Sequence, residues 1–310
     1  MAVCCLRRKH VWDIAMNLCE QSYLDLLKNC LTGSIFEESA WREVPAVAKG
    51  RTGLFTSFPV AAFRRVVISQ LRKRHLALVR MCPFDAVARA AGNDWPSIGY
   101  TMVGRARLDN IERCIRDVLE RSVPGDFIET GVWRGGSVIF MRALLRVQGV
   151  TDRVVWVADS FEGMPVPENE SDGWDLSEIG ELEVSIDEVK RNFARFGLLD
   201  DQVRFLKGWF KQTLPTAPIK RLAVLRMDGD LYTSTMDALA NLYHKVSPGG
   251  YAIVDDYKGW PGCRRAVHDF LDSRQLNPEI VDVDDQAVYW RIDDCEPANS
   301  RTEIRSKAAS

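Results

Sequence analysis

The sequence has no apolar run that approaches the ~20 residues needed to span a bilayer, so we expect no membrane-spanning helix. Its first residues, MAVCCLRRKHVWD, carry only a short apolar patch before the charges begin, too short for a secretory signal. An excess of one charge is also lacking, because 41 basic and 43 acidic residues leave a net charge of −2. No overall field therefore favours nucleic acid or an anionic membrane. We expect a cytoplasmic protein that binds neither.

The cysteines lack metal-site spacing. There are eight, but no CxxC pair, so a structural zinc site is not expected. Free thiols are expected rather than a disulfide framework in a chain of 310 residues without a predicted secretory signal. A composition of 46% hydrophobic and 27% charged residues excludes disordered and collagen-like classes and is typical of a globular protein.

The chain divides into three zones by pattern. Residues 1–110 are irregular with helical fragments, residues 111–292 alternate strand-like and helix-like segments, and residues 293–310 form a polar tail. Strand-like runs cover 125–132, 152–161, 201–209, 221–228, 251–257, 279–284 and 286–292. Helical patterns lie between most of them, and the turn sequence SPGG (247–250) is expected to end the helix before the fifth strand.

This alternation predicts an α/β fold with a mainly parallel sheet and helices on both faces. No helix separates the last two strands, so an antiparallel strand should close the sheet. Ligands of such sheets bind outside the carboxyl ends of the strands, near the point where the strand order reverses. The residues at strand ends are therefore the candidates for function.

The first strand ends in Glu129-Thr130-Gly131, followed by Gly135 and Gly136, an E-x-G-x-x-x-G-G pattern. It differs from the G-x-G-x-x-G of dinucleotide sites, and its glutamate would repel a pyrophosphate. The acid suits a ligand with an amino group or a positive centre. The alternative is a tight strand-to-helix turn with an incidental glutamate.

Asp159 ends the second strand. A carboxylate there accepts hydrogen bonds from ribose hydroxyls in both NAD-binding and methyl-donor-binding sheets, so it indicates a nucleoside without saying which. The alternative interpretation is a helix N-cap.

Asp228 ends the fourth strand and Asp255-Asp256 end the fifth, 27 residues further along. Adjacent parallel strands would bring these carboxylates together, where a hard divalent cation such as Mg²⁺, Mn²⁺ or Ca²⁺ relieves their repulsion. The alternative is that one or two of them cap helices or form salt bridges.

Several long blocks resemble one family. They are YLDLLKNCLTGSIFEE (23–38), the stretch from GNDWPSIGYTMVG to MRALL (92–145), VVWVADSFEGMPVP (154–167), LRMDGDLYTSTMDAL (225–239) and SPGGYAIVDDYKGWPGCRRAV (247–267). In these blocks the chain resembles the macrocin O-methyltransferase (TylF-type) family. The resemblance implies a class I, Rossmann-like methyltransferase fold with an N-terminal helical lid. It also implies S-adenosylmethionine as donor, Mg²⁺ assistance, a sugar or polyhydroxylated natural product as acceptor, and a homodimer.

The resemblance also implies residue roles. The donor would lie against Glu129 and Gly131 at its methionine end, against Asp159 and Ser160 at its ribose, and under Thr101 and Met102 from the lid. The metal ligands would be Asp228, Asp255 and Asp256, with Asp228 also the catalytic base.

Two other functions stay open at this stage. A catechol-type O-methyltransferase would use the same fold and metal, since any small acceptor with adjacent hydroxyls can chelate the ion. Those enzymes place a lysine shortly after the first aspartate, and this chain lacks it, because Asp228 is followed by Gly229 and Asp230. A non-catalytic nucleoside-binding scaffold would not need the three acids.

Two further segments have charge of one sign. Residues 64–80 carry six Lys/Arg and no acid, typical of a solvated helix or of a membrane-surface helix. Residues 162–183 carry eight acids and no Lys/Arg, and we expect them to form a loop near the site.

Overall fold

The main sheet has seven strands in the order β5-β4-β3-β6-β7-β9-β8. The computed structural model describes residues 18–36, 40–43 and 58–292, so the predicted tail 293–310 lies outside the described residues. The strands are β3 (Asp126–Thr130), β4 (Val155–Asp159), β5 (Val203–Lys207), β6 (Leu222–Met227), β7 (Val246–Val254), β8 (Val281–Asp282) and β9 (Val288–Arg291). The first five are mutually parallel, and β9 runs antiparallel to both β7 and β8. The predicted parallel sheet and its antiparallel closure are confirmed.

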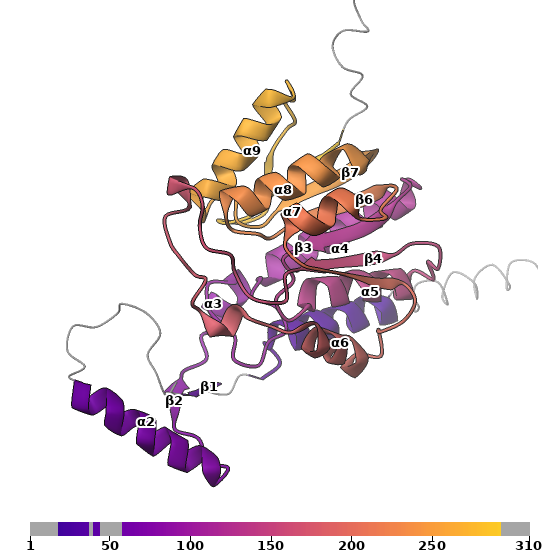
Figure 1. Cartoon of the computed structure of the whole chain (residues 1–310). Coiled ribbons are helices and arrows are strands. Elements are labelled where there is room, and N and C mark those ends of the chain that lie inside the picture. The colour runs from indigo at the N-terminus through magenta and orange to yellow at the C-terminus, as the bar shows by residue number, and fades with distance from the viewer. Residues whose placement is uncertain (1–17, 37–39, 44–57, 293–310) are drawn as a thin grey trace, which may run out of the picture.

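Helices cover both faces of the sheet, as predicted (Figure 1). One face carries α4 (Arg105–Glu120), α5 (Gly136–Val147) and α6 (Ile186–Arg195), and the other carries α7 (Phe210–Thr213), α8 (Tyr232–Leu242) and α9 (Pro261–Ser273). The short 3₁₀ turns are η1 (Glu170–Asp172), η2 (Gly180–Leu182), η3 (Leu214–Thr216) and η4 (Tyr243–Lys245). Apolar strand residues alternate between the two faces, which gives two hydrophobic clusters, one under each helical layer.

The helix at residues 18–32 belongs to this body. Leu24, Leu27 and Leu31 are buried in the same cluster as α4 and α5. Beside them the buried Lys28 ammonium contacts Asp109 and Glu112 of α4, each at 2.5 Å. The predicted zone boundary at residue 110 falls inside α4, so the site is built on a body that includes part of the N-terminal zone.

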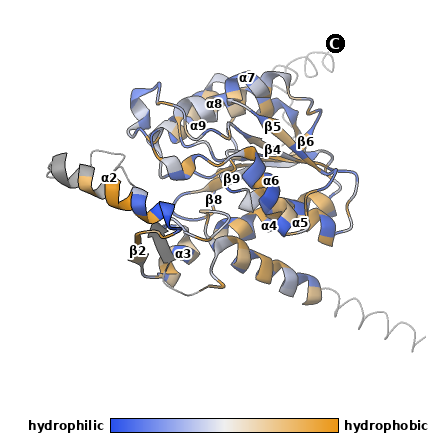
Figure 2. Cartoon of the chain, turned by 60° about the horizontal axis from the view of Figure 1, so that its bottom comes forward, coloured by the Kyte–Doolittle hydropathy of each residue, from blue (hydrophilic) through white to orange (hydrophobic). Residues whose placement is uncertain are grey.

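A separate arm precedes α3 (Ala86–Ala91). It consists of β1 (Ala40–Glu43) paired antiparallel with β2 (Val79–Cys82), and α2 (Phe58–Lys73) between them. The arm projects from the body, and α2 carries both hydrophobic and hydrophilic residues (Figures 1 and 2). Within the described ranges, no helix has the length and apolar character to cross a bilayer.

The turn sequence at 247–250 is placed differently from the prediction. The helix α8 ends at Leu242, and Ser247–Gly250 lie within β7. A register shift opposite Leu222–Val224 accommodates them, with Gly249 at φ 81°. Turn-forming residues are tolerated at such an irregularity because a bulge needs the conformations that glycine supplies.

Candidate active site

The site lies at the carboxyl ends of the neighbouring strands β3 and β6. The helices that follow these two strands, α5 and α8, lie on opposite faces of the sheet, so the strand order reverses at this point. Gly131 follows β3 with φ 87°, and a Cβ atom on it would lie 1.7 Å from the carbonyl oxygen of Asp228. Only glycine therefore lets the two strand ends approach this closely. The predicted glycine turn brings the end of β3 directly against the first predicted metal ligand.

A pocket of about 250 Å³ opens beside this turn. Its lining includes Gly131, Asp159, Ser160, Met164, Trp209, Phe210 and Asp228. The predicted acidic loop contributes residues 163–166 and 168 to the wall, so it lies at this site as expected. The pocket thus unites three predicted donor-binding residues with Asp228.

Asp159 serves the turn as well as the pocket. Its Oδ2 accepts the amide of Val132 at 2.8 Å and its Oδ1 accepts the amide of Phe161 at 2.7 Å. Burial raises the pKa of Asp159, while these amides oppose that shift. Each carboxylate oxygen has a second lone pair, so the local backbone role and a ligand role are compatible.

Glu129 does not line the pocket but lies beneath it, 1% exposed. Its Oε1 pairs with the Arg226 guanidinium, whereas its Oε2 is buried without a hydrogen-bond partner in the described structure. Burial raises its pKa to about 8, although Arg226 works against this. A buried acceptor without a partner is costly, so Oε2 has unused capacity to accept a hydrogen bond.

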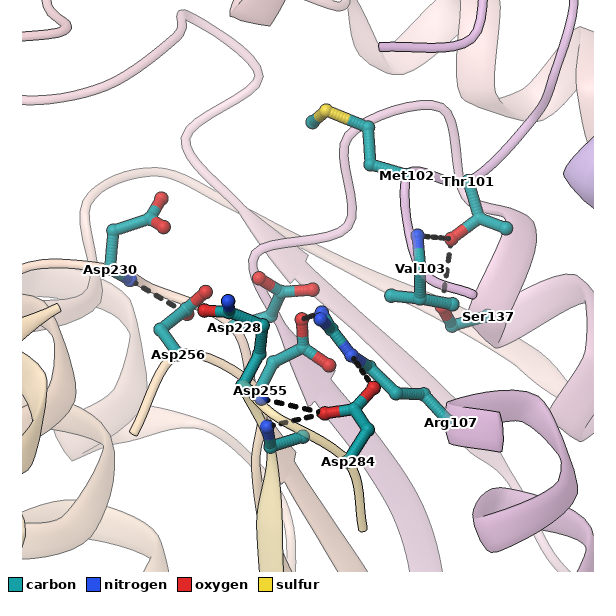
Figure 3. A network of polar contacts seen from close by, with 12 residues as sticks. Thr101, Met102, Val103, Arg107, Ser137, Asp228, Asp230, Asp255, Asp256 and Asp284 are labelled. Atoms are coloured by element: carbon teal, nitrogen blue, oxygen red, sulfur yellow. Dashed lines mark hydrogen bonds and ion pairs between the residues drawn. The ribbon is translucent and has the colours of Figure 1, made fainter. Parts of the chain in front are cut away.

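The three predicted metal ligands lie together. Carboxylate oxygens of Asp228, Asp255 and Asp256 lie within 4.8 Å of one another (Figure 3). The backbone amide of Asp230 donates to Asp256 Oδ2 at 3.1 Å. Burial and mutual repulsion raise the pKa of Asp228 to about 6 and that of Asp230 to about 7, and raise the pKa of Asp256.

Two arginines also contact these acids. Arg226 Nη1 lies 2.7 Å from Asp228 Oδ2, and its Nη2 lies 2.5 Å from Asp255 Oδ1. On the other side, Arg107 Nη1 lies 2.5 Å from Asp255 Oδ2, while its Nε contacts Asp284 at 2.8 Å (Figure 3). The salt-bridge alternative is thus true of Asp228 and Asp255. Carboxylates still outnumber guanidinium groups, so the cluster keeps carboxylate oxygens that a divalent cation could use as ligands.

Thr101 and Met102 lie on the segment before α4 and do not line the pocket. The buried Thr101 hydroxyl is 3.4 Å from that of Ser137 in the first turn of α5. The Met102 carbonyl accepts a hydrogen bond from the buried Arg89 at 2.5 Å. The predicted lid segment is therefore held against the start of α5, beside the site.

The two arginines and Asp284 were not among the predicted site residues. For Arg226 a signal existed: it is the one charged residue inside the otherwise apolar run LAVLRM of β6. A charge inside a fully buried strand requires partners, so it points to acids at the neighbouring strand ends. Arg107 and Asp284 are 177 residues apart, and nothing in their local sequence marks them.

This strand order, with one reversed strand at β9 and a ligand pocket at the reversal point, defines a class I methyltransferase fold.

Comparisons with known proteins identify the family. Residues 20–292 match the model of Macrocin-O-methyltransferase (TylF). A mycinamicin III 3''-O-methyltransferase from Micromonospora griseorubida is 51% identical over 225 residues, 70% of this chain and 88% of that protein. A demethyldecarbamoylnovobiocin O-methyltransferase from Streptomyces niveus is 45% identical over 274 residues, 87% of this chain and 92% of that protein.

A tetracenomycin rhamnoside 4'-O-methyltransferase from Streptomyces olivaceus is 55% identical over 67% of this chain and 81% of that protein. Among solved structures, the O-methyltransferase NovP superposes with a TM-score of 0.73 at 43% identity, covering 88% of this chain and 99% of NovP. The chain belongs to the TylF macrocin O-methyltransferase family and is an S-adenosylmethionine-dependent O-methyltransferase.

Proposed function

We propose that this enzyme transfers a methyl group from S-adenosylmethionine to a sugar hydroxyl of a natural-product glycoside, with Mg²⁺ held by Asp228, Asp255 and Asp256. The observation that supports this best is that Asp228 belongs to both features of the site: it lines the pocket and lies in the acid cluster. A donor in the pocket and an acceptor at the acids would therefore meet at Asp228. The named relatives that methylate sugars of natural products support the acceptor class.

The residues present fit the donor. The unpartnered Oε2 of Glu129 suits the ammonium group of the methionine part, and Gly131 lines the pocket at the turn that follows β3. Asp159 and Ser160 line the pocket where ribose hydroxyls would bind, and Trp209 and Phe210 provide an apolar wall for a base. Thr101 and Met102, on the segment before α4 that packs against the start of α5, would cover the donor only from the side of the lid.

The acid cluster fits a divalent cation, because three carboxylate oxygens converge and the two arginines contact Asp228 and Asp255 without contacting Asp256. When bound, such an ion lowers the pKa of a hydroxyl and orients it. In this chain Arg226 and Arg107 fix the Asp255 carboxylate from both sides. Asp228, the acid that also faces the pocket, accepts the hydroxyl proton as the oxygen–carbon bond forms and the carbon–sulfur bond breaks.

The proposed function is tested by a methyl-transfer assay on purified enzyme. Rhamnosides and other 6-deoxyhexosides are compared with catechols, each with and without Mg²⁺. We expect methylated glycoside and no methylated catechol, since the lysine of the catechol enzymes is missing after Asp228. Catechol turnover that exceeds glycoside turnover would contradict the proposed acceptor class.

Asp159→Asn should weaken binding of S-adenosylhomocysteine by about 1.5–3 kcal/mol, the scale of hydrogen bonds to a charged group. The amide keeps one oxygen for the backbone but loses the charge that ribose hydroxyls would meet. Calorimetry measures the affinity, with Asp175→Asn on the exposed acidic loop as the control. Equal affinity in both variants would remove Asp159 from the donor site.

We also propose that the enzyme is a homodimer associated through the projecting arm. Phe63, Val66 and Met81 of the arm are more than half exposed, an apolar surface that self-association would cover. The exposed apolar residues are interspersed with basic ones, so weak association of residues 64–80 with an anionic membrane is the alternative. Light scattering should give twice the mass of the chain, and Phe63→Glu should shift it to the monomer. A cytoplasmic location stays part of this proposal.

A further inference from the structure

The acidic loop at 162–183 exposes one large aromatic side chain. Trp174 is 68% exposed, and its ring meets that of Trp260 edge-on, with centroids 5.5 Å apart at 79°. Trp260 is half-buried and packs against the hydrophobic cluster under α8 and α9. Trp260 is therefore held by the core and supports the solvent-facing indole of Trp174. The exposed indole of Trp174 therefore offers a large apolar surface, held in place by its contact with Trp260, to a ligand from solvent.

The loop is fixed in this position by Asp172. Asp172 is buried, and its Oδ1 accepts the amide of Tyr232 at 2.6 Å, at the start of α8. At the start of α9, a Cβ atom on Gly262 would lie 2.0 Å from the same oxygen, so the loop packs this closely because residue 262 is glycine. In Figure 1 the loop between β4 and α6 reaches from the sheet edge to the near end of α9.

Trp260, the inner member of the tryptophan pair, adjoins the acid cluster. The amide of Trp260 donates to the carbonyl of Asp256 at 2.9 Å. The amide of Tyr232, held by Asp172, lies two residues after Asp230, whose own amide contacts the Asp256 carboxylate. The turn at Asp230 and the turn after Asp256 are therefore both in contact with the loop that carries Trp174. Neither tryptophan lines the donor pocket, which lies on the Asp228 side.

We infer that Trp174, supported by Trp260, is the acceptor platform of this enzyme: the apolar aglycone of a glycoside stacks on Trp174 while its sugar hydroxyls reach the acids. This inference rests on the proposed function. Methyl transfer requires the acceptor oxygen to approach opposite the sulfur, so the acceptor must enter from the side of the cluster away from the donor. An indole face suits a flat apolar ring, and the acids beside it accept hydrogen bonds from hydroxyls.

The test measures binding, independently of turnover. The probes are 4-nitrophenyl α-L-rhamnoside, which has an aryl aglycone, and methyl α-L-rhamnoside, which has none. Each is titrated into the full-length enzyme with S-adenosylhomocysteine and Mg²⁺ present. We expect the wild type to prefer the aryl glycoside by about tenfold, a scale set by one aromatic contact and its buried area. Trp174→Ala should remove the preference, and Trp174→Phe should keep most of it.

Two controls separate the platform from general damage. The exposed Leu199 lies just beyond α6, so Leu199→Ala should keep the aryl preference. Donor affinity should be the same in the wild type and in Trp174→Ala, because Trp174 does not line the donor pocket. An aryl preference that survives in Trp174→Ala overturns the platform, as does a wild type that binds both glycosides equally or binds neither.

The platform and the proposed function fail in different ways. A wild type that binds the aryl glycoside through Trp174 but methylates no glycoside contradicts the function and leaves the platform standing. Glycoside methylation with an acceptor KM unchanged in Trp174→Ala leaves the function standing and overturns the platform. A Trp174→Ala variant that sediments as a monomer, with glycoside binding unchanged, would make the surface an interface between two copies and would also overturn it.

Discussion

Asp228→Asn should reduce methyl transfer by about 10²–10⁴-fold, the usual effect of removing a general base. Asparagine keeps the shape of the side chain and can still accept from Arg226, which contacts Asp228 Oδ2 at 2.7 Å in the native protein. It loses the negative charge that would hold a cation and the basicity that would accept a proton. The variant should therefore fold and bind donor normally, so that the loss appears in turnover and not in calorimetry with S-adenosylhomocysteine.

A matched control exists in the same pocket. Asp237 lines the pocket beside Ser234 but lies outside the converging acids, so Asp237→Asn should keep its turnover within a few-fold. Treatment of the wild type with EDTA should reproduce the Asp228→Asn result, and added Mg²⁺ should restore only the wild type. Full activity in a metal-free preparation would mean that Asp255 and Asp256 are structural acids held by the two arginines.

The sequence was sufficient to predict the sheet because strand and helix periods alternate clearly after residue 125. The same order predicts which residues share an edge. Asp228, Asp255 and Asp256 were expected together from strand ends alone, and one carboxylate oxygen of each lies within 4.8 Å of the others. The carboxyl ends of parallel strands lie at one edge of the sheet regardless of the loops between them. A prediction of which strand-end residues lie together therefore tolerates errors in the strand boundaries.

Features fixed by packing could not be predicted in the same way. Residues 247–250 have the sequence of a helix stop, yet they form part of β7, which pairs with the neighbouring strand β6 with a register shift. The helix at 18–32 looks like one fragment among others, but three fully or nearly buried leucines and Lys28 dock it on α4. Both outcomes depend on partners far along the chain, which local patterns do not contain.

Arg226 is the residue on which the fold and the site depend together. Its side chain is fully buried and contacts Glu129, Asp228 and Asp255, and these acids hold its pKa above the usual value. Methionine is of similar length and apolar, so Arg226→Met fills the space but leaves buried carboxylates without their cation. Breaking a buried ion pair on one side costs about 3–5 kcal/mol, so we expect a loss of that order in the free energy of unfolding.

Urea denaturation measures this loss, and its pH dependence identifies the cause. Burial already raises the pKa of Glu129 to about 8 and of Asp228 to about 6, and removal of Arg226 should raise both further. An acid with a raised folded-state pKa binds protons more tightly in the folded state, so its penalty diminishes as the pH falls. The deficit of Arg226→Met should therefore be smaller near pH 5.5 than near pH 8.

Arg142→Met is the control for the loss of a buried arginine. Arg142 is also buried, but its partner Asp200 is 39% exposed and can return to water when the arginine is removed. This variant should lose less stability, and its deficit should not diminish below neutral pH as that of Arg226→Met does, because pairing lowers the pKa of Asp200 instead of raising it. Equal deficits with equal pH dependence would show that the acids around Arg226 do not need its charge, and that Arg226 contributes to the fold through packing alone.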